Sequence, residues 1–209
     1  MKFVVFGDIH GDLFALEEVR HKCNVDGVEI AICIGDLSYF EHDLDFLLEV
    51  LNDFPVPVLI IHGNHELKEN VELITSYLPN LSFVHKKIIK MKNFNFMFYG
   101  GDGFSKLDKE FEEWSNKEIK KLDVENTILF LHGPPYNTKL DVPYDNHHCG
   151  NKSTKKFLEK QQILMSVSGH VHEGENLTDF VGKTFLINPG PLGMIIDLKD
   201  IQKQRELKN

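Results

Sequence analysis

The chain has 209 residues, 42% of them hydrophobic and 26% charged, which is typical of a folded globular protein and excludes a disordered or fibrous chain. Its net charge of −9, with histidines neutral, argues against a protein that binds nucleic acid through positive charge alone. No apolar run approaches the roughly 20 residues that cross a bilayer, and three dispersed cysteines indicate reduced thiols. We expect one domain over residues 1–209, in the cytoplasm and without a membrane partner.

The first part of the chain alternates apolar runs with amphipathic segments. We predict strands over residues 2–6, 29–34 and 56–61, and helices over residues 13–22, 43–52 and 66–77. Strands that alternate with helices in this way indicate a parallel sheet with crossover helices.

The remainder of the chain predicts a second sheet. Residues 83–91 and 94–99 flank Lys92-Asn93 and are typical of an antiparallel pair. Further strands are expected over residues 127–131, 163–168, 177–181, 184–187 and 193–197, with helices over residues 109–122 and 153–160. Residues 136–152 are polar and predict a long loop, which is often functional. The pattern predicts an α/β fold in which two mixed sheets pack face to face, with helices outside.

Five of the predicted strands end at a short turn that combines glycine with Asp, Asn or His. The turns are Gly7-Asp8-Ile9-His10-Gly11, Gly35-Asp36, Gly63-Asn64-His65-Glu66, His132-Gly133-Pro134-Pro135 and Gly169-His170-Val171-His172. Loops at the carboxyl ends of parallel strands line the ligand crevice, so the turns should converge. Asp8 and His10 are two residues apart, as are His170 and His172, and an extended backbone would point both members of each pair the same way.

The residue types in these turns suit divalent metal ions. Imidazole, carboxylate and amide groups bind Mn, Fe, Zn, Ni or Co, and seven such groups can hold two ions with one carboxylate as a bridge. Each residue alone has an ordinary explanation, because Gly-Asp and Gly-Asn are common turn dipeptides and His10 and His132 could be core histidines. The five turns taken together favour metal ligation.

In order, the turns resemble the signature of the calcineurin-like metallophosphoesterases, which is D-x-H, G-D, G-N-H-[ED], an isolated H and G-H-x-H. The resemblance extends over residues 8–172 and implies a four-layer αββα sandwich. The ligand set that it implies is Asp8, His10 and His172 for one metal ion, Asn64, His132 and His170 for a second, and Asp36 as the bridge. Two divalent ions are thus the implied cofactors, Mn first, with Fe, Ni, Zn, Co or Mg as alternatives.

The activity that the resemblance implies is hydrolysis of a phosphate ester, with His65, Asp36 and Asn64 as catalytic residues. Two ions about 3.5–4 Å apart clamp an in-line displacement and lower the pKa of a shared water to about 7, so that hydroxide attacks phosphorus. His65 would bind no metal, and would face the substrate and either protonate the leaving oxygen or stabilise the transition state. Such a general acid contributes about 10²–10⁴-fold.

The scarcity of arginine bears on the substrate, since arginine occurs only at positions 20 and 205. Protein phosphatases of this superfamily carry G-D-x-V-D-R-G, whereas this chain has Gly35-Asp36-Leu37-Ser38-Tyr39-Phe40. A phosphate dianion favours a bidentate guanidinium. We therefore expect a phosphodiester or a small phosphomonoester, with nucleotides and nucleic acid among the candidates, rather than a phosphoprotein.

Two other functions share the fold and stay open: a non-catalytic scaffold, as in retromer subunits, and a regulatory module that binds a nucleotide without cleaving it. The full ligand set and His65 favour an enzyme. Apolar residues near 94–98 and the C-terminal strands could form an edge that pairs two copies into a homodimer.

Several other residues have structural interpretations or more than one interpretation. We expect His62 to be structural or to support the ligands from behind, and His21, His42 and His85 to lie at the surface or an edge. His147 and His148 belong either to a solvated loop or to one that closes over the site and contacts substrate. Residues 100–103, Gly-Gly-Asp-Gly, are either a hairpin exit or part of the crevice.

Overall fold

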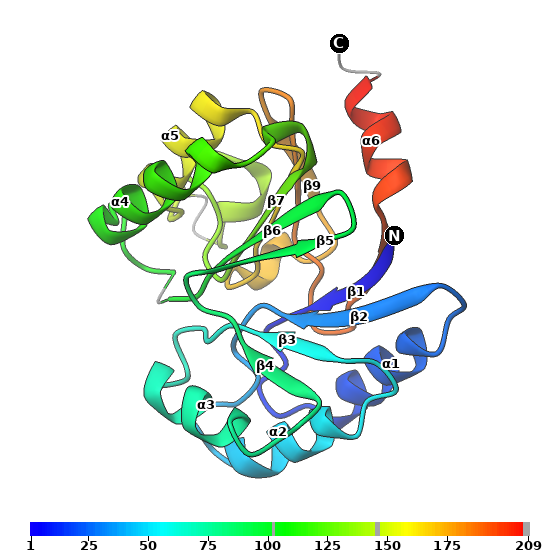
Figure 1. The fold of residues 1–209 in the computed structure, drawn as a ribbon. Helices are drawn as coiled ribbons and strands as arrows, with labels where there is room; N and C mark the ends of the chain where they lie inside the picture. Colours follow the sequence, from blue (N-terminus) through cyan, green and yellow to red (C-terminus); the bar gives the residue numbers. More distant parts are fainter. Residues whose placement is uncertain (102, 145–146, 207–209) are drawn as a thin grey trace.

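The computed structural model describes residues 1–101, 103–144 and 147–206, and two β-sheets that lie face to face form its centre (Figure 1). Asp102, which the sequence places at the crevice or at a hairpin exit, lies outside the described residues, as do Asp145 and Asn146 of the long loop.

The first sheet has the strand order β11-β1-β2-β3-β4. Its strands are β1 Lys2–Phe6, β2 Val28–Cys33, β3 Val58–Ile60, β4 Leu81–Phe83 and β11 Met194–Asp197. Strands β1 to β4 are parallel, and β11 pairs antiparallel with β1. The crossover helices α1 Leu13–Cys23, α2 Leu44–Asn52 and α3 Lys68–Thr75 cover its outer face (Figure 1). The carboxyl ends of β1, β2 and β3 therefore lie at one edge.

The second sheet has the strand order β5-β6-β7-β8-β10-β9. Its strands are β5 Lys87–Met91, β6 Phe94–Tyr99, β7 Thr127–Leu131, β8 Met165–Val167, β9 Thr178–Val181 and β10 Thr184–Ile187. The four central strands are parallel, with β5 and β9 antiparallel at the edges. Helices α4 Lys109–Glu118 and α5 Lys152–Gln161 cover its outer face (Figure 1). The layers are thus helix, sheet, sheet, helix, which confirms the predicted αββα sandwich.

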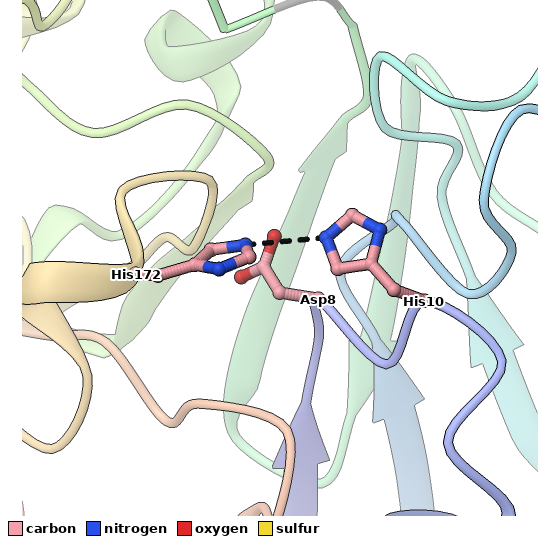
Figure 2. A group of neighbouring side chains, drawn as sticks. All are labelled: Asp8, His10 and His172. Atoms are coloured by element: carbon pink, nitrogen blue, oxygen red, sulfur yellow. Dashed lines mark hydrogen bonds between the residues drawn. The ribbon is translucent and has the colours of Figure 1, made fainter.

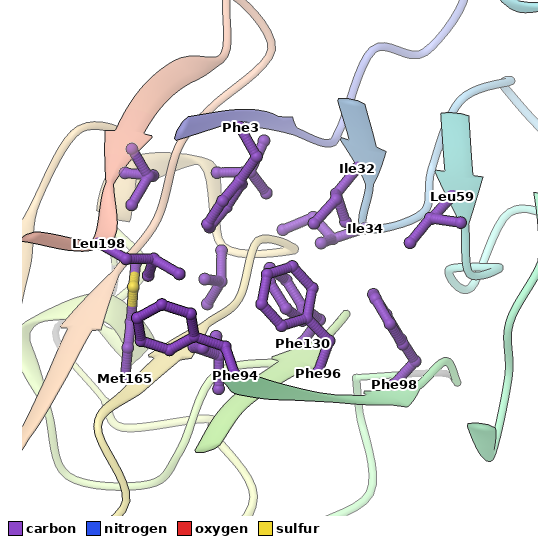
Figure 3. Close-up of a cluster of buried hydrophobic side chains, with 14 of the residues drawn as sticks. Phe3, Ile32, Ile34, Leu59, Phe94, Phe96, Phe98, Phe130, Met165 and Leu198 are labelled. Carbon is purple, nitrogen blue, oxygen red and sulfur yellow. The ribbon is translucent and has the colours of Figure 1, made fainter. Parts of the chain in front are cut away.

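The strand pleat divides the apolar side chains between two cores. Phe3 and Val5 of β1 face the space between the sheets, whereas Val4 and Phe6 face the helices. Figure 3 shows the core between the sheets, where Phe3 meets Phe130 and its neighbours from the second sheet. This core fixes the sheets relative to each other, and with them the loops that carry the site.

The predicted strand over residues 83–91 is wrong. Strand β4 ends at Phe83 in the first sheet, and β5 begins at Lys87 in the second. Between them the chain crosses from one sheet to the other through a turn in which Lys86 has a φ of 53°. A single continuous strand could not belong to both layers.

Two helical segments also differ from the prediction. Residues 109–122 are α-helical only to Glu118, and a 3₁₀ turn, Ile119–Lys121, follows. The chain then closes with a helix that the sequence did not predict, α6 Leu198–Glu206. The buried residues of α6 are Leu198 and Ile201. Two apolar positions are too few to reveal a helical period in the sequence. Within the described part of the chain, no helix has the length and apolar character that crossing a bilayer requires.

We predict that Phe130→Ala weakens the fold strongly. The Phe130 ring is fully buried and stacks on Phe98 at 4.9 Å between centroids. Truncating such a ring costs about 3–5 kcal/mol, measurable by urea unfolding followed by circular dichroism. Phe14→Ala is the matched control, since this ring is 67% exposed, and it should change the free energy of unfolding by less than about 0.5 kcal/mol. Equal effects of the two substitutions would contradict the assigned core.

Candidate metal centre

Short loops at the carboxyl ends of β1, β2, β3, β7 and β8 carry the seven residues that the sequence predicts as metal ligands, together with His65, which it predicts as a catalytic residue that binds no metal. These residues are Asp8, His10, Asp36, Asn64, His65, His132, His170 and His172. The structure brings them together across both sheets. The carboxylate and imidazole donor atoms form three overlapping groups, and the atoms of each group lie within 4.8 Å of one another. Two of these groups consist of predicted metal ligands alone, and the third combines His10 and Asp36 with His65.

The loop backbone is left-handed at several of these residues instead of extended. The φ angle is 56° at Asp8, 49° at His10, 52° at Asp36 and 68° at His170. The predicted alternation along an extended backbone is therefore wrong, although the side chains still converge. A left-handed non-glycine residue costs about 1–2 kcal/mol, and such strain gathers at functional sites. Here Asp8 N–H donates to the carbonyl of Gly35, and His10 N–H to that of Asp36, each at 3.0 Å.

Asp8, His10 and His172 form the first donor group (Figure 2). His10 Nε2 and His172 Nε2 face each other at 3.2 Å. Burial raises the pKa of Asp8 and lowers the pKa of His10, so both groups are disfavoured in their charged forms. A carboxylate and two imidazoles that converge on one point fit a divalent cation well.

Asp36, His132 and His170 form the second donor group. His132 Nδ1 lies 3.1 Å from the carbonyl oxygen of Ile34, and a carbonyl can only accept, so this nitrogen carries a proton. The other nitrogen, Nε2, then directs a lone pair at Asn64 Oδ1, 2.9 Å away, and at Asp36 Oδ2, 3.3 Å away. Three acceptors that face one another need a proton or a cation between them.

The proton-bound form of this group explains two pKa shifts. Burial disfavours charged His132, but the hydrogen bond and charge of Asp36, with the charges of Asp8 and Glu66, raise the pKa of His132 to about 9. Burial likewise disfavours ionised Asp36, but the hydrogen bond and charge of His132 lower the pKa of Asp36 to about 2. A divalent cation would take the place of that proton, and so the second group also fits a metal.

The Asp36 carboxylate lies between the two donor groups. Besides His132, its Oδ2 lies 3.8 Å from His10 Nε2 and 3.8 Å from His65 Nε2. Its Oδ1 accepts the backbone N–H of His65 at 3.0 Å. This central place is the one that a bridging ligand requires.

Glu66 supports this arrangement, and the sequence assigned it no role. Its buried carboxylate accepts from Asp36 N–H, Ser38 N–H, Ser38 Oγ and Gly63 N–H at 2.9–3.0 Å. It thereby ties the loop after β2 to the loop after β3. Burial, with the nearby charge of Asp36, raises the pKa of Glu66. Its sequence signal was its place directly after His65, at the acidic position of the G-N-H-[ED] motif.

His65 points its outer nitrogen at the site. The backbone N–H of Phe40 donates to His65 Nδ1 at 3.2 Å, so a neutral His65 carries its proton on Nε2. The ring contacts Phe40 at 4.2 Å and Tyr39 at 5.1 Å between centroids. The side chain is 13% exposed, so this proton faces the site from a fixed position.

The remaining histidines lie outside the donor groups. His21 and His42 are exposed, as predicted, but His85 is half-buried against His62, with ring centroids 4.8 Å apart. Its Nδ1 accepts the N–H of Gly100 at 3.0 Å. Burial, reinforced by neighbouring positive charges, lowers the pKa of His62 to about 4 and that of His85 to about 3.

The long loop forms part of the wall of the site. A cavity of about 830 Å³ opens in front of the donor groups, and Pro143 and Cys149 of the loop line it. His148 turns away towards the buried Asp141, with 2.7 Å between Nδ1 and Oδ1. The loop therefore contacts the cavity, but not through His148, which anchors it.

A profile of the calcineurin-like phosphoesterase family matches residues 1–174, and the chain belongs to that family. The uncharacterized protein MJ1162 of Methanocaldococcus jannaschii is 32% identical over 203 residues, covering 91% of this chain and 88% of that protein. A probable glycerophosphodiester phosphodiesterase, GpdQ, of Arcobacter nitrofigilis is 23% identical over 154 residues. The match covers 69% of this chain and 56% of that protein. The crystal structure of TT1561 of Thermus thermophilus matches with a TM-score of 0.73 at 14% identity and covers 96% of this chain and 95% of that one. At this identity, the match supports the fold alone.

We predict that Glu66→Gln weakens metal binding while leaving the protein folded. Glutamine keeps the shape but loses the charge and turns an NH₂ group towards N–H donors. Loss of such a supporting residue typically lowers metal affinity about 10–100-fold, measurable by titration calorimetry with Mn²⁺. Glu125→Gln, at an exposed position, should bind Mn²⁺ like the wild type. An unchanged affinity in Glu66→Gln would show that the four hydrogen bonds do not position the ligands.

We predict that metal-free protein loses stability as the pH falls from about 6.5 towards 4, in part through His85. Its folded pKa, about 3, lies below the ordinary value of 6.5, so the unfolded chain binds the proton first and stability falls with pH in this window. His85→Gln keeps an acceptor for Gly100 N–H and should flatten the pH dependence of the unfolding free energy. His42→Gln is the exposed control. Equal slopes in His85→Gln and the wild type would refute the assignment.

Proposed function

We propose that this chain is a dinuclear metal-dependent phosphoesterase that hydrolyses a phosphodiester or a small phosphomonoester. The observation that carries the proposal is the position of Asp36 Oδ2 between two donor groups drawn from both sheets. Asp8, His10 and His172 would hold one ion, and Asn64, His132 and His170 the other, with Asp36 shared. Mn²⁺ is the metal that we propose to test first, and the imidazole, carboxylate and amide ligands also accept Fe, Ni, Zn, Co or Mg.

The bound ions would supply a water of lowered pKa as nucleophile and would neutralise charge that grows on the phosphoryl oxygens. The chain's own residues do the positioning. His132 keeps its Nε2 free for ligation because Ile34 holds its Nδ1 proton. Glu66 holds the backbone on which Asp36 sits.

His65 is placed to protonate the leaving oxygen. The Phe40 N–H fixes the tautomer that leaves a proton on Nε2, and this nitrogen lies 3.8 Å from Asp36 Oδ2, at the edge of the donor set. A proton donor there would offset the charge of the departing alkoxide, which is the step that a general acid accelerates.

The charges around the cavity favour a phosphodiester over a phosphomonoester. Neither Arg20 nor Arg205 lines the cavity, and Lys106 is the one lysine or arginine among the lining residues that the structure describes. A diester carries one negative charge and needs no guanidinium clamp. The similarity to a probable glycerophosphodiester phosphodiesterase agrees with this preference.

The test is hydrolysis of bis(p-nitrophenyl) phosphate by the full chain with added Mn²⁺. We expect His65→Ala to lower kcat by about 10²–10⁴-fold with Mn²⁺ affinity within about twofold of wild type. Asp36→Ala should abolish turnover and remove at least one bound ion, counted by metal analysis after dialysis. His42→Ala, an exposed histidine, is the control and should behave like the wild type. Absence of metal-stimulated turnover on diester and monoester alike would refute the enzyme proposal.

A further inference from the structure

The cavity in front of the donor groups has exposed aromatic walls. Tyr39 is 60% exposed, Phe40 68% and Phe104 69%, and all three line it. Exposed aromatic surface beside a polar site is unfavourable in water, because each ring offers a large apolar area. A ligand that covers these rings would remove that cost.

The rings approach the donor groups from both sheets. Tyr39 and Phe40 follow β2 and contact His65. Phe104 follows β6 and stands edge-on to His170, with 4.4 Å between ring centroids. A ligand whose phosphate meets the donor groups therefore finds aromatic surface immediately on either side.

The size and charge of the cavity restrict the class of ligand further. Its volume of about 830 Å³ is far more than a phosphate group needs and lies within the range of small-molecule sites. Lys106 is the one lysine or arginine among its described lining residues, and the chain carries a net charge of −9. A long polyanion would be repelled, whereas one flat ring linked to one phosphodiester charge fits.

We propose that the substrate is a small phosphodiester that carries a nucleobase-sized aromatic ring, which stacks on Phe104 and Phe40. This rests on the proposed function and adds the substrate class and two specificity-determining residues to it. Aromatic stacking suits the bases because each presents a flat π-face to an aromatic side chain.

The experiment compares two diesters that differ only in the base, adenosine 5′-methyl phosphate and methyl riboside 5-methyl phosphate, with hydrolysis followed by ³¹P NMR. We expect kcat/KM to be about tenfold or more higher for the adenosine ester. The ratio of the two kcat/KM values should fall several-fold in Phe104→Ala and in Phe40→Ala. In Phe104→Tyr, which keeps an aromatic ring, the ratio should stay close to that of the wild type. If a substitution disturbs His65 or His170, it lowers kcat/KM for both diesters, and this common effect cancels in the ratio. Tyr77→Ala, at a 76% exposed ring outside this cavity, should leave it unchanged.

A second measurement needs neither metal nor turnover. Saturation-transfer NMR of adenosine with metal-free protein should show strong transfer to the ring protons H2 and H8, and this transfer should weaken in Phe104→Ala but not in Tyr77→Ala. Equal kcat/KM for the two diesters, or ring transfer that is absent or insensitive to Phe104→Ala, would overturn the inference. Turnover of bis(p-nitrophenyl) phosphate would meanwhile keep the proposed function, so the two failures are separable.

Discussion

The arrangement of the site depends on keeping acceptor atoms in contact that would otherwise repel one another. Asn64 Oδ1 lies 2.9 Å from His132 Nε2, and Asp36 Oδ2 lies 3.3 Å from the same nitrogen. In the absence of a cation a proton must fill this space, which is why the pKa of His132 rises to about 9 in spite of its burial. Folding must bring these atoms together so that a proton or a cation can bind between them, and the rest of the molecule supplies the constraints that do so.

Three kinds of interaction supply those constraints. The apolar core fixes the two sheets face to face, and hydrogen bonds between loops fix the backbone above the strand ends. Glu66 adds a buried carboxylate behind Asp36 that holds two loops through four hydrogen bonds. This carboxylate is itself costly to bury, so its hydrogen bonds are the reason that it is tolerated. Ligand geometry is thus set in part by Glu66, which lies outside the donor groups.

Much of this architecture was predictable from the sequence, because strand and helix periods and the five glycine-containing turns are local patterns. The fold class and the family followed from them. The left-handed backbone at Asp8 and the role of Glu66 did not, since both depend on partners about 30 residues away in the chain, such as Gly35 for Asp8 and Asp36 for Glu66. The break between β4 and β5 was also not predictable from the sequence, because an apolar run does not show where the chain passes from one sheet to the other.

The two donor groups also bind the halves of the fold to each other. The first combines Asp8 and His10 from the first sheet with His172 from the second. The second combines Asp36 with His132 and His170, again across both sheets. A cation in either group would therefore link the sheets directly, and its binding free energy would add to the stability of their packing. Because Asp36 Oδ2 lies 3.8 Å from His10 Nε2 of the first group and 3.3 Å from His132 Nε2 of the second, its carboxylate is the point at which the two groups meet.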